Sequence, residues 1–393
     1  MLRRRALLIG AASAAGLSLA GLGYRAWDRG LWSAGEGPAY APWGEWQGDG
    51  AEGLKQPLHA AILAANPHDT QPWLFRCEGN AISVFADRAR NLGSFDPFRR
   101  EMHLGLGAAI ENLVLAARAF GWSVQVQPAE GRLSLSPADT PLLAASLAFT
   151  HAPPVRDALF DAIPHRHTNR GPYFADRPIG TDSLDRLTHA AESDAVAIYF
   201  AVGKTVREEL GKLIVAATES IIADPKMSAD SARWFRTGRR EIAAHRDGVT
   251  VDTAGLSPLV TALSKILPDM DARSADQYWL ALTRDSQIAS APLLGMLLVR
   301  DRLDMRTAIG AGRAWQRLHL AATAEGLAAQ PLNQPVERID RDAMLGKPGG
   351  FGPALAELAG LPGWEPTFVF RLGIPERAAG PSPRRALDEV ILA

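Results

Sequence analysis

The segment Gly107-Ala-Ala-Ile-Glu-Asn-Leu-Val-Leu-Ala-Ala-Arg-Ala-Phe-Gly121 decides the fold, because a second copy follows at Gly312-Arg-Ala-Trp-Gln-Arg-Leu-His-Leu-Ala-Ala-Thr-Ala-Glu-Gly326. The two segments align without a gap, and eight positions are identical, the first and last glycines included. Apolar residues recur three and four positions apart, which predicts two helices that each end at a glycine able to adopt a left-handed conformation. Low-complexity Ala and Leu sequence is the alternative explanation, but it does not account for the matched glycines.

Each copy of the repeat follows an apolar stretch that ends in Asp-Arg. Ile82–Phe85 precedes Asp87-Arg88, and Leu293–Val299 precedes Asp301-Arg302. Both stretches have the composition of strands, so the order of strand, Asp-Arg, loop and helix occurs twice. A further alternating stretch, Thr367–Gly373, predicts another strand near the C-terminus. The predicted fold class is α+β.

This long-range repeat indicates a gene duplication. The two halves, at about 54–150 and 151–393, each correspond to one subunit of an ancestral dimer, so we expect a tandem pseudo-dimer in one chain, with antiparallel sheets flanked by helices. Only the second half contains a helical insertion, at about 223–267. Its apolar residues must pack on a neighbouring surface; they are Trp234, Phe235, Leu256, Leu259, Val260 and Leu263.

The composition sets aside several classes of function. With 47% hydrophobic residues and a net charge of -1, the chain is globular and lacks the basic field of a nucleic-acid-binding protein. The single cysteine, Cys77, forms no internal disulfide and indicates a small buried thiol. The histidines do not have the spacing of a metal site, and an arginine stands between His165 and His167, so we expect no metal.

The N-terminus has the layout of an export signal. Arg3–Arg5 precede the apolar stretch Ala6–Leu22, and Arg4-Arg5-Ala6-Leu7-Leu8 fits the twin-arginine pattern. The stretch is at the short limit for crossing a bilayer, which favours a signal over a permanent anchor; an ordinary N-terminal helix is the alternative. We expect residues 1–30 to direct export to the periplasm and residues 31–53 to be a linker. Whether the signal is cleaved stays open, and an uncleaved segment would tether the protein to the membrane.

The most distinctive local string is Asn66-Pro-His-Asp-Thr-Gln-Pro-Trp73. Its two prolines break regular structure, so its polar residues lie on a rigid loop that can present amide and hydroxyl groups to a planar ring. The candidate binding residues of this loop are Asn66, His68, Asp69, Thr70, Gln71 and Trp73.

A second string, Arg166-His-Thr-Asn-Arg170, has the pattern of a phosphate clamp. Arg166, Thr168 and Arg170 alternate, so in an extended segment two guanidinium groups and a hydroxyl project from one face. Asn169 is a further candidate binding residue of this string. A solvated basic loop is the alternative.

The strings together resemble the nitroreductase superfamily, and in particular its Acg-type branch, in which two nitroreductase halves are fused. Asn66–Trp73 is similar to the superfamily loop that contacts the flavin, and Arg166–Arg170 to the motif that binds the FMN phosphate. By this resemblance the loop after the second repeat helix, with Gln330, Pro331 and Leu332, covers the isoalloxazine ring, and Arg384 or Arg385 completes the clamp. A plain basic tail is the alternative for these two arginines. Asp69 departs from the pattern because the superfamily has asparagine there. A carboxylate near the flavin would disfavour the anionic reduced form, which leaves productive redox use in question.

The resemblance implies an FMN-dependent oxidoreductase that uses NAD(P)H to reduce nitro compounds or quinones. The cofactor carries this chemistry, so no side chain is assigned as a catalytic acid or base. A flavin-storing or flavin-sequestering protein is the alternative, since the helical insertion is expected to form a lid over the flavin. A scaffold with an idle pocket is a third reading. Because each half supplies only part of the site, we expect one FMN in a monomeric chain.

Overall fold

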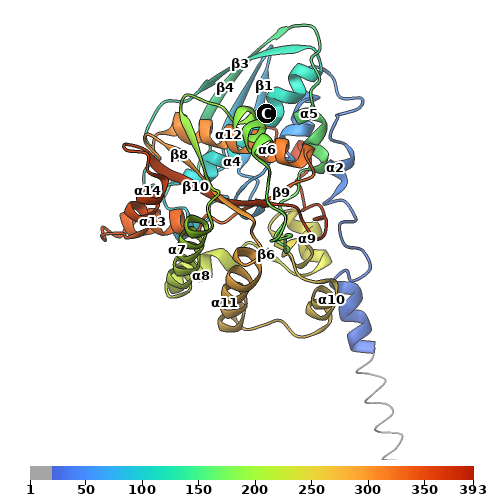
Figure 1. Cartoon of the computed structure of the whole chain (residues 1–393). Helices are drawn as coiled ribbons and strands as arrows, with labels where there is room; N and C mark the ends of the chain where they lie inside the picture. Colours follow the sequence, from blue (N-terminus) through green and yellow to red (C-terminus); the bar gives the residue numbers. More distant parts are fainter. Residues whose placement is uncertain (1–19) are drawn as a thin grey trace, which may run out of the picture.

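The computed structural model describes residues 20–393, and the twin-arginine residues predicted above lie outside this range. Two four-stranded antiparallel sheets lie on either side of a central pair of helices (Figure 1). The first sheet contains β1 (Trp73–Glu78), β2 (Ala81–Ala86), β3 (Trp122–Pro128) and β4 (Leu142–His151). The second contains β5 (Val196–Ala201), β8 (Leu293–Val299), β9 (Ala328–Pro331) and β10 (Glu365–Gly373).

The two sheets have the same topology. The strand order is β1-β2-β4-β3 in the first sheet and β5-β8-β10-β9 in the second, so each strand of one half has a counterpart in the other. The repeat helices α4 (Arg100–Ala119) and α12 (Met305–Ala324) occupy equivalent positions between β2 and β3 and between β8 and β9. The predicted α+β pseudo-dimer is therefore confirmed.

The repeat helices cross at their glycines. A Cβ atom on Gly107 would lie 2.1 Å from the carbonyl oxygen of Ile309, and one on Gly312 would lie 2.0 Å from that of Leu104. Leu104 and Ile309 are themselves equivalent positions in the repeat, so the contact is reciprocal, like that at a two-fold dimer interface. Only glycine permits backbones to approach this closely.

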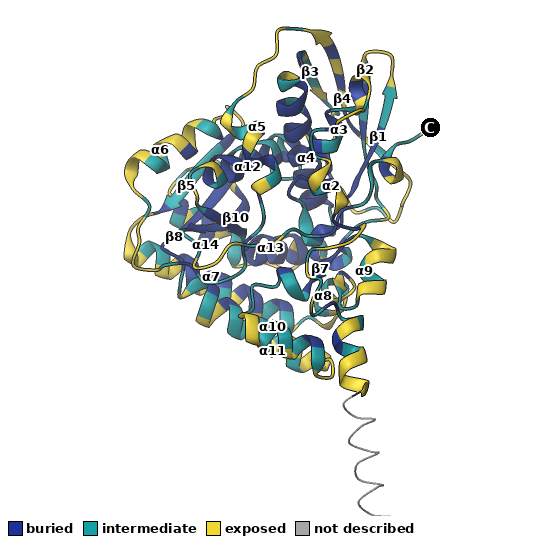
Figure 2. Cartoon of the chain, turned by 90° about the vertical axis from the view of Figure 1, so that its right-hand side faces the viewer, coloured by how far each residue is buried: buried dark blue, intermediate teal, exposed yellow. Residues whose placement is uncertain are grey.

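Both helices end as the sequence predicts. Gly121 and Gly326 follow the last turns with φ angles of +86° and +72°, which glycine adopts without strain. The helices also extend further towards their N-termini than the aligned segments, and most of their residues are buried between the two sheets (Figure 2).

The halves differ most between their first two strands. A tight turn at Gly79 and Asn80 connects β1 to β2, whereas residues 202–292 connect β5 to β8. The insertion predicted at about 223–267 is the central part of this longer segment. The segment contains α7 (Lys204–Ile222), α8 (Pro225–Ala232), α9 (Arg239–His245), α10 (Pro258–Ile266), α11 (Ala272–Ala281), a π-helix (Leu282–Ile288) and the short strands β6 (Phe235–Arg236) and β7 (Val249–Thr250).

The insertion buries only part of its apolar surface. Trp234 and Met227 pack with Leu92 and Phe95 of the first half in a small separate core. The expectation that all of its apolar residues are packed is wrong, because Leu259 and Leu263 are 70% and 43% exposed.

The C-terminal tail passes from the second half to the first. Beyond β10, the backbone N–H of Arg384 donates to the carbonyl of Ala39, and Ile391 forms a parallel bridge with Phe75 of β1. The tail therefore carries basic side chains to the loop at Asn66–Trp73. The other helices are α2 (Ala41–Gly44), α3 (Leu58–Ala61), α5 (Ala158–Ala162), α6 (Thr181–Ala190), α13 (Gln334–Met344) and α14 (Phe351–Ala359). Among the described helices, none has the length and apolar character needed to span a bilayer.

Candidate functional site

The loop that precedes β1 has an unusual backbone. His68, Asp69 and Gln71 have φ angles of +48°, +55° and +49°, a region that non-glycine residues seldom adopt. Each such residue costs on the order of 1 kcal/mol or more, so the surrounding structure must hold the loop in place. Clusters of this kind are typical of binding and active sites.

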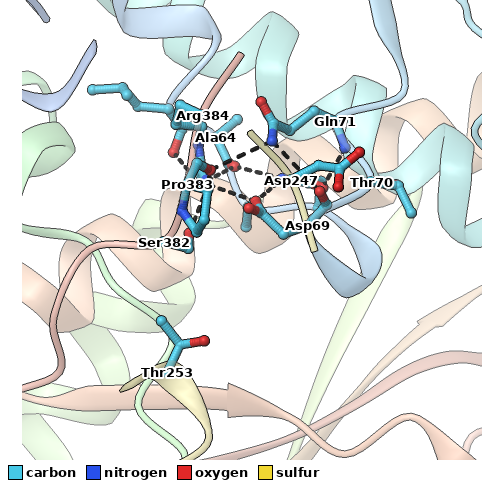
Figure 3. A network of polar contacts seen from close by, with 12 residues as sticks. Ala64, Asp69, Thr70, Gln71, Asp247, Thr253, Ser382, Pro383 and Arg384 are labelled. Carbon is cyan, nitrogen blue, oxygen red and sulfur yellow. Dashed lines mark hydrogen bonds and ion pairs between the residues drawn. The ribbon is translucent and has the colours of Figure 1, made fainter. Parts of the chain in front are cut away.

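Two distant segments hold this loop. The side-chain amide of Gln71 donates to the carbonyl of Arg246 (2.8 Å) and accepts from the backbone N–H of Arg385 (2.7 Å). The backbone N–H of Gly248 donates to the carbonyl of Asp69 at 3.1 Å. The insertion and the C-terminal tail therefore fix the loop from two sides (Figure 3).

A polar cavity lies beside the loop, and both halves of the chain line it. Its volume is about 30 Å³, which gives room for about two water-sized groups. Six predicted binding residues line it: Asn66, Asp69, Arg166, Thr168, Arg170 and Arg384. The loop of the first half, the clamp of the second half and the tail thus converge on one place.

The arginines of this cavity have more N–H donors than the surrounding chain has acceptors for them. Arg166 donates from Nη2 to the carbonyl of Leu63 (3.1 Å), but its buried Nε and Nη1 have no partner in the described chain. Arg384 likewise leaves Nε unpaired, and Arg170 donates to the carbonyl of Thr253 (3.0 Å). Burial lowers the pKa of Arg166 to about 9, and the nearby Arg384 charge acts in the same direction. Unpaired buried guanidinium donors are costly unless an anion accepts from them.

Asp69 is the acidic residue of the cavity. One carboxylate oxygen accepts from Arg384 Nη1 at 2.5 Å, and the other is buried without a partner (Figure 3). Burial raises the pKa of Asp69 to about 6, although the Arg384 charge opposes this. The carboxylate therefore faces the arginines of the clamp. An anion that enters the cavity meets this negative charge directly.

The other predicted site residues do not line this cavity. His68 lies against Phe95 and Ser231, and burial lowers its pKa to about 4. Arg385 is turned the other way, with its guanidinium donating to the carbonyl of Glu389. Of the remaining residues, Trp73 and Leu332 are core residues, and Thr70 and Gln71 are buried in the loop. The Asn169 side chain donates to the carbonyl of Arg377, and the Gln330 side chain accepts from Arg371. Pro331 pairs with Phe370 in the second sheet. Their contacts with a flavin ring stay a prediction.

Some lining residues were not predicted. His167 lies inside the clamp string, and its ring packs edge-on against Trp43 with centroids 4.5 Å apart. Its position between Arg166 and Thr168 in the predicted clamp was the sequence signal that could have identified it. Ala65 directly precedes the predicted loop. The remaining lining residues come from the insertion and the tail, where no short pattern marks them: Gly248, Val249, Thr253, Gly380 and Ser382.

Comparisons with known proteins extend the sequence resemblance to nearly the whole chain. No family model matches. A Mycobacterium tuberculosis protein provisionally named NAD(P)H nitroreductase Rv3131 is 26% identical over 350 residues, which cover 87% of this chain and 91% of the relative. The M. tuberculosis protein provisionally named NAD(P)H nitroreductase acg is 27% identical over 351 residues, which cover 86% of this chain and 94% of the relative. The predicted resemblance to the Acg-type, nitroreductase-like proteins is therefore confirmed.

Solved structures of single-length and longer nitroreductases also align with this chain. The FMN-dependent nitroreductase NfnB of Mycobacterium smegmatis, solved with NADPH, is 17% identical, with a TM-score of 0.39, and covers 60% of this chain and 97% of its own. A protein of Anabaena variabilis provisionally named a nitroreductase is 13% identical, with a TM-score of 0.43, and covers 83% of this chain and 74% of its own.

Proposed function

We propose that this double-length relative of the Acg-type proteins is an FMN-binding oxidoreductase that takes electrons from NAD(P)H and reduces nitro compounds or quinones. The observation that carries the proposal is the set of buried, unpaired donors of Arg166 and Arg384, in a cavity that both halves of the chain build. A phosphate monoester supplies the acceptor oxygens that these donors lack. The names of the curated relatives support the same activity.

The residues present fit the phosphate end of FMN. Arg166, Arg170 and Arg384 would bind its oxygens, with the Thr168 hydroxyl between them. When bound, FMN supplies the hydride chemistry, accepting from the nicotinamide and donating to the second substrate. The protein's part is to hold the phosphate, to shape the loop at 66–71, and to limit the access of water.

The insertion bears on the choice between an oxidoreductase and a flavin store. Gly248, Val249 and Thr253 form one wall of the cavity, and Gly248 binds the loop through the carbonyl of Asp69. We propose that residues 246–253 act as a lid that opens when FMN enters, since the cavity as it stands is much smaller than a flavin. In an oxidoreductase this lid must reopen, or leave the face of the flavin ring accessible to NAD(P)H and the second substrate. A flavin-storing protein has no such requirement.

The absorption spectrum of the purified chain tests these proposals. We expect a flavin spectrum that NADPH bleaches within seconds and a nitroaromatic compound restores. If NADPH bleaches it slowly while dithionite does so quickly, the store is the better description. A protein that binds no flavin from excess FMN contradicts both.

We further propose one FMN per monomeric chain. The first half has no arginine between Gly44 and Leu58, where the counterpart of the clamp would lie, so the second site of an ancestral dimer has lost its phosphate ligands. The measurement is the ratio of released flavin to protein, together with the mass in solution. Two flavins per chain would contradict this count.

The site of action is proposed from the N-terminal sequence alone. The pattern Arg4-Arg5-Ala6-Leu7-Leu8 supports export of the folded protein to the periplasm. Replacing both arginines with lysine should retain the protein in the cytoplasm. Equal periplasmic amounts of the wild type and the double variant would exclude the twin-arginine route.

A further inference from the structure

The exposed apolar side chains of this protein are concentrated at one end. Fourteen large apolar side chains of the described chain are exposed, and eight of them lie in residues 22–32 and 259–270, while the other six are spread over separate parts of the sequence. The eight residues are Leu22, Tyr24, Trp27, Trp32, Leu259, Leu263, Leu267 and Met270. We call them the basal patch.

The two parts of the basal patch are fixed side by side. Arg25, in the helix at 20–28, donates from Nε and Nη2 to the carbonyl of Leu267 at 3.1 and 2.8 Å. Arg29 binds Asp269 at 2.7 Å, and the buried Lys265 of α10 donates to the carbonyl of Gly30 at 3.0 Å. Both views show this helix beside α10 at the same end of the molecule (Figures 1 and 2).

The basal patch has the pattern of a membrane-surface contact. Leu259 and Leu263 are spaced by four residues, so they lie on one face of α10, while Lys265 is buried. Leu267 directly follows the last residue of α10 and is 50% exposed, so it extends this exposed apolar stripe. Tyr24, Trp27 and Trp32 are 49–70% exposed next to this stripe. Tryptophan and tyrosine are enriched at the boundary between lipid and water, and amphipathic helices bind there through their apolar face.

The sequence before the patch identifies the partner. The apolar stretch Ala6–Leu22 leads directly into the helix at 20–28, so it joins the described chain at Leu22, which is itself part of the basal patch. A second copy of the chain could cover the patch, but it would leave that segment without an apolar environment. We propose that the basal patch rests on a phospholipid bilayer, with α10 lying along the lipid headgroups.

This proposal does not depend on the flavin. It applies to the chain with an uncleaved N-terminus, because Leu22, Tyr24 and Trp27 lie within the expected export signal at 1–30. It does place the cavity wall and the membrane contact on one continuous segment, because Thr253 of the wall lies shortly before Pro258, where α10 begins.

The test uses the full chain with a single environment-sensitive dye. In a Cys77→Ser background, one variant carries the dye at Leu263→Cys and a matched control carries it at Leu135→Cys. Leu135 is 52% exposed, lies between β3 and β4, and belongs to neither segment of the basal patch. Vesicles of phosphatidylethanolamine and phosphatidylglycerol should shift the emission of the dye at 263 to shorter wavelength and leave the dye at 135 unchanged.

A second variant measures the contribution of α10. Replacing Leu259, Leu263 and Leu267 together with serine should weaken vesicle binding at least about tenfold, since each leucine leaves the lipid. Three outcomes overturn the proposal. In the first, the chain floats with vesicles while the dye at 263 stays in water, so only the N-terminal segment binds. In the second, the chain ignores vesicles and sediments as a dimer that the serine variant abolishes. In the third, the dye at 263 is shielded before vesicles are added, so the chain's own apolar segment covers the patch.

Discussion

The carboxylate of Asp69 should make anion binding depend on pH. Asp69 shares its cavity with Arg166, Arg170 and Arg384, and its unpaired oxygen is buried there. An anion bound to the arginines repels the ionised carboxylate in the same cavity, so Asp69 must take up a proton as the anion enters. With its proton, Asp69 can instead donate a hydrogen bond to the anion.

The size of the effect follows from the pKa of Asp69, which burial raises to about 6. Each pH unit above this value adds about 1.4 kcal/mol to the cost of protonation. Between pH 6 and pH 8 the dissociation constant should therefore rise by up to roughly a hundredfold. Below pH 6 the dependence should level off, because the free protein already carries the proton.

Sulfate is the appropriate probe, because its charge does not change in this range, whereas the phosphate of FMN titrates near pH 6. Calorimetry at pH 6, 7 and 8 should show the loss of affinity for the wild type and little change for Asp69→Asn, which should bind more tightly at pH 8. Asp247→Asn is the matched control. Asp247 is buried nearby but is paired with Arg90 and Arg236, outside the cavity lining. Its charge contributes to the raised pKa of Asp69, so this variant should keep the slope of the pH dependence and move its onset to lower pH. A flat wild-type profile, or an equal slope in Asp69→Asn, would refute the reasoning.

Four further predictions concern other parts of the molecule. Arg166→Ala should weaken FMN binding roughly tenfold or more through the loss of a charge-assisted contact, while riboflavin binding, measured by fluorescence quenching, should not change. Gly312→Ala should lower the free energy of unfolding by several kcal/mol, roughly the cost of overpacking or more, because the added Cβ would lie 2.0 Å from the carbonyl oxygen of Leu104. Gly310→Ala in the same helix is the control, since a Cβ there meets no atom within 4 Å, and denaturant titration should show an unchanged free energy of unfolding. Burial lowers the pKa of His103 to about 4, so the folded state resists its protonation and the free energy of unfolding falls as the pH drops from about 6.5 towards 4. In His103→Gln about one proton fewer is taken up on unfolding in this range, so the melting temperature should fall less steeply with pH than in the wild type. Trp234→Ala should loosen the insertion and speed NADPH reduction of bound flavin more than dithionite reduction in stopped flow, and equal acceleration of both would count against a lid.

The repeat was predictable because its signals are local. The spacing of apolar residues and the terminal glycines mark the two long helices without any knowledge of their surroundings. The clamp was predictable for a similar reason, since Arg166, Thr168 and Arg170 need only an extended backbone to face one way. The structure brings all three to one cavity.

The wall of the cavity was not predictable. Gly248, Val249 and Thr253 reach the loop at 66–71 only through the packing of the whole insertion, which no short pattern encodes. Which of Arg384 and Arg385 faces the cavity was not predictable from the sequence either. Successive residues of an extended tail point in opposite directions, and the register depends on the bond between Arg384 and the carbonyl of Ala39.

The reciprocal contact of Gly107 and Gly312 has a consequence for how this protein can change. In a dimer of identical subunits every substitution is inherited twice, and an enlargement of one subunit is also an enlargement of its partner. Here a single gene encodes both sides of the interface, so one half can gain residues 202–292 while the other keeps a two-residue turn. Selection can therefore act separately on the half that supplies the clamp and on the half that supplies the loop.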